Sequence, residues 1–206
     1  DNVCCGRPAI SKGLVELATK AAIQNVERLY AAAAEGVPIV GCEPSCLLSL
    51  RDEYPHLVPA DMKAKAEVVA KQTFLVDEFL AELSEKGELE LKWKAVASER
   101  RPVLFHGHCH QKAFAHPQKS LDLLELAGYD TTFANAACCG MAGAYGVEKE
   151  HYEASRLAGE RVLFPLVREM PEADVTVMGV SCRQQIEHFT GRQAHHLVEV
   201  LRDAIE

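Results

Sequence analysis

The sequence contains two pairs of adjacent cysteines, each followed by glycine. They are Cys4-Cys5-Gly6 and Cys138-Cys139-Gly140, and a Ser-Cys step follows each pair downstream, as Ser45-Cys46 and Ser181-Cys182. Neighbouring cysteines do not easily form an ordinary disulfide, because consecutive α-carbons do not offer the separation that such a bridge needs. Two adjacent thiolates therefore predict a metal site, and one that holds more than one metal ion.

The composition is that of an ordinary globular protein. Of the 206 residues 48% are hydrophobic, and the formal net charge of -8 argues against a nucleic-acid surface, which needs concentrated Lys and Arg. No apolar run reaches the roughly 20 residues of a membrane helix. The 8 cysteines are too few in a chain of this length for a disulfide scaffold. Their clustering therefore indicates a reducing, cytoplasmic setting. Because the chain starts at Asp1 without a leader pattern, we expect a piece of a longer polypeptide or a processed chain.

Hydrophobic periodicity predicts helices that alternate with strands. In the first half we expect helices over residues 12–34, 47–53 and 61–86, a strand over 37–41, and a short strand or hairpin arm at Leu89, Leu91 and Trp93. In the second half we expect strands over 103–106, 130–134 and 175–179, and helices over 117–127, 148–168, 184–189 and 195–205.

The two halves repeat one order of features: a cysteine pair with glycine, a long helix, a strand, a Ser-Cys step and another helix. We therefore predict an α/β fold of two related halves, 1–100 and 101–206, each with a small, mostly parallel sheet flanked by helices. The boundary is expected near Arg100-Arg101-Pro102. In parallel sheets, sites form beyond the carboxyl ends of the strands, so we expect both metal sites there.

Each Cys-Cys-Gly is expected to begin a turn into a helix, where free N–H groups stabilise anionic sulfur. In the second copy Gly140, Gly143 and Gly146 are expected to let the main chain approach a bulky inorganic group. Cys42 and Cys46 have zinc-knuckle spacing, whereas the adjacent pairs do not. Sulfur ligation suits zinc or iron-sulfur, and adjacent thiolates favour an iron-sulfur cluster.

Three longer strings resemble a known family. They are His108-Cys109-His110-Gln111-Lys112-Ala113, Cys138-Cys139-Gly140-Met141-Ala142-Gly143, and the stretch from Gly179 to Ile186 around Cys182. The chain resembles the cysteine-rich CCG domain of heterodisulfide reductases, of iron-sulfur subunits of glycolate and glycerol-3-phosphate oxidoreductases, and of lactate-utilisation proteins. It looks closer still to the carboxyl-terminal part of fusion proteins that carry an FAD-linked 2-hydroxyacid dehydrogenase.

The resemblance implies electron transfer from a substrate such as D-2-hydroxyglutarate or D-lactate, through FAD in an upstream domain, to iron-sulfur centres of the 4Fe-4S type and an acceptor. It implies upstream FAD and ferredoxin-like domains as partners, and a cytoplasmic or peripheral inner-membrane location. The implied ligands of the second site are Cys109, Cys138, Cys139 and Cys182. Those of the first site are Cys4, Cys5, Cys42 and Cys46.

Other polar residues flank these cysteines. His106, His108 and His110 alternate around Cys109, and in an extended segment they would point away from it, so we expect His108 and His110 to hydrogen-bond around the site rather than to bind metal. Lys112 and Arg183 stand beside ligands and can offset cluster charge. His195-His196 is expected to start a helix.

Two other classes of function remain open. A structural zinc-binding or partner-docking module without redox activity is one, and zinc is expected as a possible metal of the isolated fragment. A thiol-disulfide centre is the other, although the chain has no Cys-x-x-Cys motif. Neither a phosphate loop nor a dinucleotide fingerprint is present, so FAD is expected to bind outside this chain.

Overall fold

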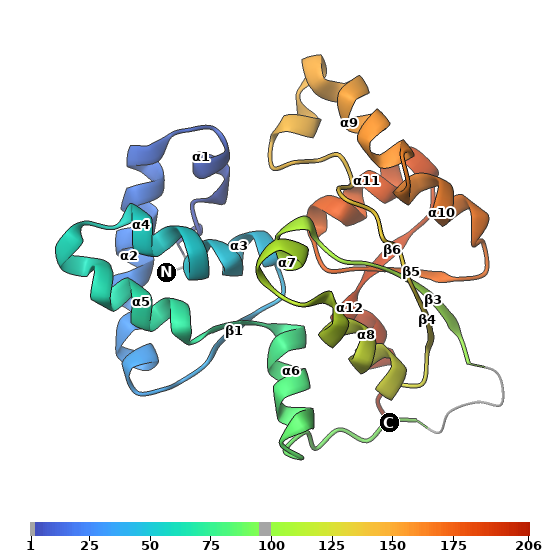
Figure 1. Ribbon diagram of the computed structural model, residues 1–206, viewed down its shortest axis with the longest axis horizontal. Coiled ribbons are helices and arrows are strands. Elements are labelled where there is room, and N and C mark those ends of the chain that lie inside the picture. The colour runs from blue at the N-terminus through green and yellow to red at the C-terminus, as the bar shows by residue number, and fades with distance from the viewer. Residues whose placement is uncertain (1–2, 95–99) are drawn as a thin grey trace. The chain divides into compact units, whose positions relative to one another are not determined.

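A computed structural model describes residues 3–94 and 100–206 (Figure 1). The chain divides into two compact units, Asp1–Val76 and Asp77–Glu206. The predicted α/β class with small parallel sheets flanked by helices is confirmed in both. The sequence halves 1–100 and 101–206 describe the repeat of motifs and stay a prediction, and residues 95–99 of the first half lie outside the described residues.

The first unit contains a two-stranded parallel sheet with helices around it. Its register pairs Ile39 with Thr73 and Gly41 with Leu75. The elements in chain order are α1 (Arg7–Ser11), α2 (Val15–Ala34), β1 (Ile39–Gly41), α3 (Pro44–Leu48), a π-helical turn (Ser49–Glu53), α4 (Tyr54–Leu57), a 3-10 turn (Ala60–Met62), α5 (Lys63–Lys71) and β2 (Thr73–Leu75).

The core of the first unit forms where α2 packs against α4 and α5. The predicted helix over 12–34 is confirmed as α2, which carries alanines on its buried face. Ala22 and Val26 of α2 are fully buried against Tyr54 and Ala66. Small side chains allow helices to approach closely, so a short chain segment still encloses a dense core.

The predicted helix over 61–86 is wrong in its middle, because β2 interrupts it between α5 and α6 (Val76–Glu85). Thr73 ends α5 by donating its hydroxyl hydrogen to the carbonyl of Val69 at 2.8 Å. Its own carbonyl accepts two hydrogen bonds from the Arg51 guanidinium, at 2.8 and 3.2 Å. Pairing with β1 and this arginine contact override the helical periodicity, which only reports which side chains are apolar.

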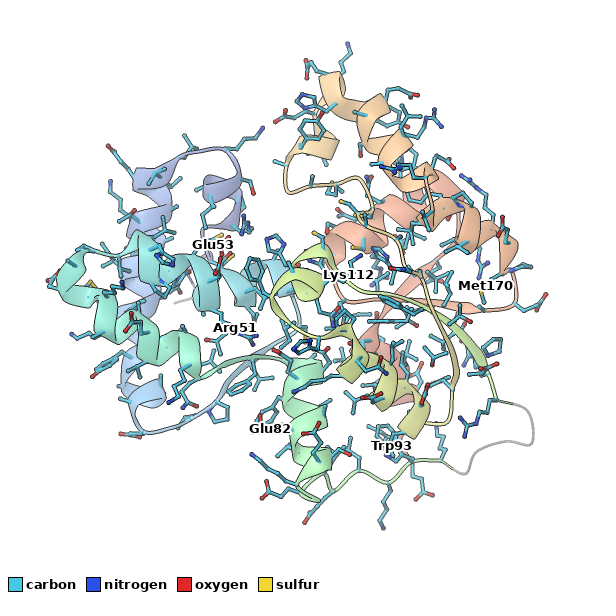
Figure 2. The ribbon with its side chains drawn as sticks, viewed as in Figure 1. Arg51, Glu53, Glu82, Trp93, Lys112 and Met170 are labelled. Carbon is cyan, nitrogen blue, oxygen red and sulfur yellow. The ribbon has the colours of Figure 1, made fainter. Side chains whose placement is uncertain are left out.

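The predicted helix over 47–53 is found as a composite of α3, the π-helical turn and α4. Pro55 stands at the start of α4 and has no N–H to continue an α-helical ladder, which accounts for the change of helical type nearby. The wider turn carries Ser49, Arg51 and Glu53, and Figure 2 labels the latter two. π-Helical turns of this kind often occur at functional sites.

The second unit contains a four-stranded, all-parallel sheet in the order β4-β3-β5-β6. Figure 1 shows α10 and α11 on one side of this sheet and α8 and α12 on the other. The remaining elements in chain order are β3 (Pro102–His106), α7 (Cys109–Phe114), α8 (Pro117–Leu126), β4 (Asp130–Phe133), 3-10 turns (Tyr145–Val147 and Lys149–His151), α9 (Tyr152–Glu160), α10 (Leu163–Glu169), β5 (Asp174–Val177), α11 (Val180–Thr190), β6 (Ala194–His196) and α12 (Leu197–Asp203).

The central strands β3 and β5 form the core of this sheet. Leu104 and Phe105 of β3, with Val175 and Val177 of β5, are almost completely buried. A strand with both faces covered by helices carries apolar residues in succession rather than in alternation. This explains why these short apolar runs were recognisable as strands from the sequence.

The predicted helix over 148–168 is wrong as a single helix, because it breaks between α9 and α10. A side chain at Gly159 would place its Cβ 2.2 Å from the ring of Phe164, which is fully buried. The close packing of the α9 backbone on this ring requires the chain to turn at Val162, whose φ of -147° is not helical. Helical periodicity on either side of the turn hides the break from the sequence.

The predicted helix over 195–205 begins later than expected. His195 and His196 lie in β6, and His196 then caps α12, with its Nδ1 accepting from the Val198 N–H at 3.2 Å. The helix expected over 184–189 begins earlier, at Val180. Among the described residues the expected strand arm at Leu89–Trp93 is reduced to one isolated antiparallel bridge between Trp93 and Ile205.

Within the described residues, no helix combines the length and the apolar character that crossing a membrane requires.

The contact between Gly159 and Phe164 gives a stability prediction. Alanine normally favours a helix over glycine by about 1 kcal/mol, but Gly159→Ala is expected to lower the free energy of unfolding by about 1–2 kcal/mol, because the added methyl group overpacks a buried ring. Urea unfolding of metal-free samples measures this change. Ala154→Gly, at an exposed position of the same helix, serves as the propensity control. A stabilised Gly159→Ala variant contradicts the packing explanation.

Candidate metal centre

Three parallel strands of the second unit end beside the cysteines predicted as ligands of the second site. Cys109 is the first residue of α7, which follows β3, and Cys182 lies in the first turn of α11, which follows β5. Cys138 and Cys139 lie in the loop that follows β4. Because β4, β3 and β5 are neighbours and parallel, their carboxyl ends share one edge of the sheet.

The four cysteine side chains contact one another in a continuous series. Hydrogen-bonding contacts join Cys109 to Cys138, Cys138 to Cys139, and Cys139 to Cys182. The two inner residues are almost inaccessible, with 4% of Cys139 and 2% of Cys182 exposed, whereas Cys109 and Cys138 are half-buried. Sulfur donors spread along a partly shielded series fit an iron-sulfur cluster, whose ligands bind different iron atoms, better than a zinc ion, which all four ligands must surround.

The pKa values of these thiols are shifted in opposite directions along the series. Hydrogen bonds from Cys109 and Cys139 lower the pKa of Cys138, and a hydrogen bond from Cys139 lowers that of Cys182. The donors Cys109 and Cys139 have raised pKa values for the same reason, aided by burial. The direction of the shift therefore alternates along the series, since neighbouring sulfurs cannot all carry charge at once.

Backbone N–H groups add to the stabilisation of anionic sulfur. The N–H of Gly140 donates to the Cys138 sulfur at 3.3 Å, and the N–H of Ala142 also lowers the pKa of Cys138. The N–H groups of Met141 and His110 act in the same way on Cys139 and Cys109. Oriented amides of this kind favour bound anionic groups and tune the potential of an iron-sulfur cluster.

The segment around Cys109 does not stay extended, which corrects the expectation that the histidines point away from that cysteine. The backbone turns into α7 at Cys109, and the Nδ1 atoms of His108 and His110 lie 3.9 and 3.8 Å from its sulfur. The rings of His108 and His110 stack with centroids 5.4 Å apart. The ligand atoms of these three residues lie within 4.8 Å of one another, so they form a second candidate metal-binding group.

His108 also has a structural role. Its Nδ1 accepts a hydrogen bond from the N–H of His110 at 3.2 Å and thereby caps α7. Its Nε2 lies 3.3 Å from the hydroxyl of Ser181, the neighbour of Cys182. The same imidazole therefore connects the segment of Cys109 to the segment of Cys182, and its predicted role around a bound metal stays a prediction.

His106 is a residue that the sequence analysis weighed only as one of three alternating histidines. It is buried at the end of β3, and its ring lies near enough to Cys182 to lower the pKa of that thiol. Neither ring nitrogen has a nitrogen or oxygen partner among the described residues. His106 is therefore a candidate partner of the Cys182 sulfur.

Lys112 is closely associated with the site. Its ammonium group donates to the carbonyls of Ala136 and, at 2.9 Å, Ala137, which precede the cysteine pair (Figure 2). Burial lowers the pKa of Lys112, while the negative charge of all four cysteines acts in the opposite direction. Lys112 thus joins the cysteine loop to α7 and places a cation near the sulfurs, and its compensation of cluster charge stays a prediction.

Arg183 has other partners. Its guanidinium pairs with Glu187 at 3.1 Å and with Glu199 at 3.5 Å, although it follows Cys182 directly in the chain. These carboxylates offset its charge, so its predicted contribution to the site stays a prediction.

Two glycines of the second loop are needed for packing, and the expected approach of the loop to an inorganic group stays a prediction. A Cβ at Gly140 would lie 2.1 Å from the carbonyl oxygen of Ser155, and its φ of 98° also favours glycine. A Cβ at Gly146 would lie 2.6 Å from both the Gly140 carbonyl and the Ser155 hydroxyl. These two glycines allow the loop to pack against α9, and the loop continues into 3-10 turns rather than directly into an α-helix.

The first unit brings together three of the four predicted first-site cysteines. The sulfurs of Cys5 and Cys46 are 3.1 Å apart, and Cys4 also forms a hydrogen-bonding contact with Cys5. The contact with Cys46 is the main reason why the pKa of Cys5 falls to about 6, and it raises that of Cys46. The expected turn from Cys-Cys-Gly into a helix is present in the first unit, because Gly6 directly precedes α1.

Cys42 lies in the turn after β1 and is exposed. Its pKa is raised, first by desolvation and then by the negative charge of Glu43. Glu43 itself caps α3 by accepting hydrogen bonds from the N–H and hydroxyl of Ser45. The assignment of Cys42 to the first site stays a prediction.

Three polar side chains to which the sequence assigned no role hold the two cysteine pairs by their carbonyls, and a fourth supports one of them. Asn25, Tyr54 and Gln185 donate to the carbonyls of Cys4, Cys5 and Cys139, and Ser155 accepts a hydrogen bond from Gln185. No local sequence signal marks them, since each lies far in the sequence from the cysteine pair that it contacts, although Gln185 shares α11 with Cys182.

Comparison with known proteins identifies the family. A model of the cysteine-rich CCG domain matches residues 1–51 and 103–187, so the chain belongs to this family. It is 32% identical, over 98% of its length, to a subunit of the anaerobic glycerol-3-phosphate dehydrogenase of Escherichia coli K12, and covers 49% of that protein. It is 31% identical over 95% of its length to the D-2-hydroxyglutarate dehydrogenase of Pseudomonas putida, covering 18% of it.

A further relative is the lactate utilization protein A of Bacillus cytotoxicus, which is 26% identical over 71% of this chain. The chain spans about half the length, or less, of the first two relatives. No solved structure matches it.

The low pKa of Cys5 predicts a pH profile for its reactivity. In the metal-free chain, the rate at which iodoacetamide alkylates Cys5 is expected to reach half its maximum near pH 6 and to fall about tenfold per pH unit below that. Peptide mass spectrometry at timed quenches measures the rate. Because the contact with Cys46 is the main cause, Cys46→Ala is expected to move the midpoint toward 9. An unchanged midpoint in that variant contradicts the assigned cause.

Proposed function

We propose that this chain is the iron-sulfur electron-transfer module of a flavin-linked 2-hydroxyacid dehydrogenase. The observation that carries the proposal is the continuous series of sulfur contacts from Cys109 through Cys138 and Cys139 to Cys182. A cluster with several iron atoms lets adjacent thiolates bind different metals, which a single zinc ion does not require. Relatives that carry this family's domain are named as dehydrogenases or dehydrogenase subunits, which supports a role in an oxidoreductase.

In this proposal Cys109, Cys138, Cys139 and Cys182 hold a cluster of the 4Fe-4S type at the second site. The cluster would supply a one-electron carrier. The chain's own residues limit the access of water, since Cys139 and Cys182 are buried. Gly140 and Ala142 direct N–H groups at sulfur, and Lys112 adds a positive charge. These contacts stabilise the negative charge that increases when such a centre accepts an electron.

The first site, with Cys4, Cys5, Cys42 and Cys46, is proposed as a second centre of the same electron path. Electrons would come from FAD in an upstream domain or partner subunit, accompanied by ferredoxin-like domains, and leave to a separate acceptor. The relative named as a glycerol-3-phosphate dehydrogenase subunit supports a separate subunit. The D-2-hydroxyglutarate dehydrogenase, of which this chain covers 18%, supports a domain within a longer chain. We propose a cytoplasmic location, with peripheral contact at the inner membrane through the acceptor.

One observation favours a second candidate, a zinc-binding module without redox activity. His108, Cys109 and His110 bring their ligand atoms within 4.8 Å, which is close to the spacing of ligands around zinc. In this alternative the metal stabilises the fold or a docking surface. It predicts stoichiometric zinc, no visible absorption and unfolding upon chelation.

Metal analysis distinguishes the two candidates. After anaerobic reconstitution with iron and sulfide, the chain and the full-length protein are expected to contain both elements, to absorb visible light and to give an EPR signal in one oxidation state. Iron and acid-labile sulfide assays, absorption and EPR measure these properties. Full-length protein that binds zinc but no iron contradicts the proposal and supports the alternative.

A cysteine substitution tests the ligands of the second site. Cys139→Ser is expected to remove that site's share of iron and absorbance, because serine offers a harder and less acidic ligand. The metal-free variant is expected to lose only about 1–3 kcal/mol of unfolding free energy, since one buried sulfur becomes a hydroxyl.

Cys46→Ser is the matched control for Cys139→Ser, because it is expected to reduce the iron of the first site alone. Unchanged iron content in folded Cys139→Ser removes this residue from the ligand set.

A further inference from the structure

Each cysteine pair is held by a backbone carbonyl that accepts a hydrogen bond from a side-chain amide, and each amide also donates to a hydroxyl. In the second unit, the Gln185 amide donates to the Cys139 carbonyl at 3.1 Å and to the Ser155 hydroxyl at 2.7 Å. In the first unit, the Asn25 amide donates to the Cys4 carbonyl at 3.1 Å and to the Tyr54 hydroxyl at 2.9 Å. The two arrangements share an amide and a hydroxyl but differ in detail, because Asn25 holds the carbonyl of the first cysteine of its pair and Gln185 that of the second.

Three of these four side chains are buried, whereas Asn25 is half-buried and its bond to the Cys4 carbonyl is exposed. Gln185 is 4% exposed and Ser155 is 1% exposed. Tyr54 is fully buried and donates its hydroxyl hydrogen to the Cys5 carbonyl at 2.8 Å. A buried amide or hydroxyl is retained where its hydrogen bonds are made, because an unpaired one is costly.

The amide and the hydroxyl have exchanged places between the two copies. In the first copy the amide belongs to α2, which follows the cysteine pair, and the hydroxyl belongs to α4, which follows the Ser-Cys step. In the second copy the hydroxyl belongs to α9, after the pair, and the amide to α11, which contains the Ser-Cys step. The matching groups are therefore not the same repeat positions carried along by duplication.

The physical need that both copies meet is control of the peptide planes. In an extended segment two consecutive side chains point to opposite sides, so adjacent cysteines share a site only if the backbone between them is turned. Fixing a carbonyl fixes the peptide plane and hence the direction of the N–H group at its other end. In the second copy the peptide whose carbonyl Gln185 holds contains the Gly140 N–H, which donates to the Cys138 sulfur at 3.3 Å.

We propose that Gln185 with Ser155, and Asn25 with Tyr54, are positioning residues that turn each cysteine pair toward its metal site and aim backbone N–H groups at the sulfurs. The inference rests on the proposed metal function of the cysteines. The positioning itself belongs to the protein chain and exists before any metal binds. Each amide acts on its own pair of cysteines.

Hydrogen exchange in the metal-free chain tests whether the side chains of Gln185 and Asn25 hold the backbone of the cysteine pairs, an arrangement called the carbonyl clamp below. Gln185→Met keeps the length and volume of the side chain but removes the donor, so the amide of Gly140 is expected to exchange about tenfold faster, as fits the loss of one hydrogen bond. Asn25→Leu is expected to accelerate exchange in the segment of Cys5 to Arg7 by a similar factor. Each variant serves as the control for the other, because the untouched copy is expected to keep its exchange rates.

Gln118→Met, at an exposed glutamine that pairs with Asp122 on α8, is the surface control and is expected to change neither segment. If Gln185→Met does not fold, Ser155→Ala, which removes one hydroxyl, and Asn25→Leu carry the test. Folded variants whose cysteine loops exchange at parental rates overturn the proposal.

Reconstituted protein gives a second readout. If the N–H groups are misdirected, Gln185→Met is expected to retain iron but to show a more negative reduction potential, because hydrogen bonds to sulfur stabilise the reduced state. A parental potential in a variant with accelerated exchange overturns the link to the sulfurs. Failure of every form, including the parent, to bind iron refutes the proposed function, whereas the exchange result in metal-free protein still decides the clamp.

Discussion

Crowding of anionic sulfur is the constraint on which the second unit depends. Four thiol groups in hydrogen-bonding contact cannot all ionise in a partly buried cluster unless positive charge or oriented dipoles surround them. The parallel sheet supplies this environment at little structural cost, because three strand ends share one edge and each leads into a turn or a helix beginning with free N–H groups. Lys112 and the amides of the cysteine loop complete the compensation.

The two units satisfy this constraint with unequal frameworks. The second has four parallel strands and helices on both sides of the sheet, whereas the first has only two short strands. In the first unit the framework comes instead from helices: Arg7, directly after the cysteine pair and its glycine, donates to Ser49 and pairs with Glu53 of the π-helical turn. A wide helical turn thus performs the anchoring that a larger sheet provides in the second unit.

Sequence reasoning reached the elements whose signal is local. The strand at 103–106 is an uninterrupted apolar run, and the cysteine pairs are recognisable from their spacing, so the fold class and the grouping at strand ends followed. The strand β2 was missed because its identity depends on pairing with β1 and on Arg51, and the break before α10 depends on the contact of Gly159 with Phe164. The hydrogen bonds to the cysteine carbonyls were not predicted, because bonds between residues distant in the sequence produce no periodic pattern.

The hydrogen bonds of His108 bear on the choice of metal. Its Nδ1 accepts the N–H of His110, so the lone pair of that nitrogen is occupied and the proton of the neutral ring lies on Nε2, which can donate to Ser181. Binding a metal through Nδ1 would use the same lone pair and remove the cap of α7, at about 1 kcal/mol. His196 caps α12 with the same nitrogen and directs Nε2 at the Met178 carbonyl, 3.0 Å away. Capping by Nδ1 is thus a recurrent structural device in this unit, and it favours His108 as a support for the cysteine site over a zinc ligand.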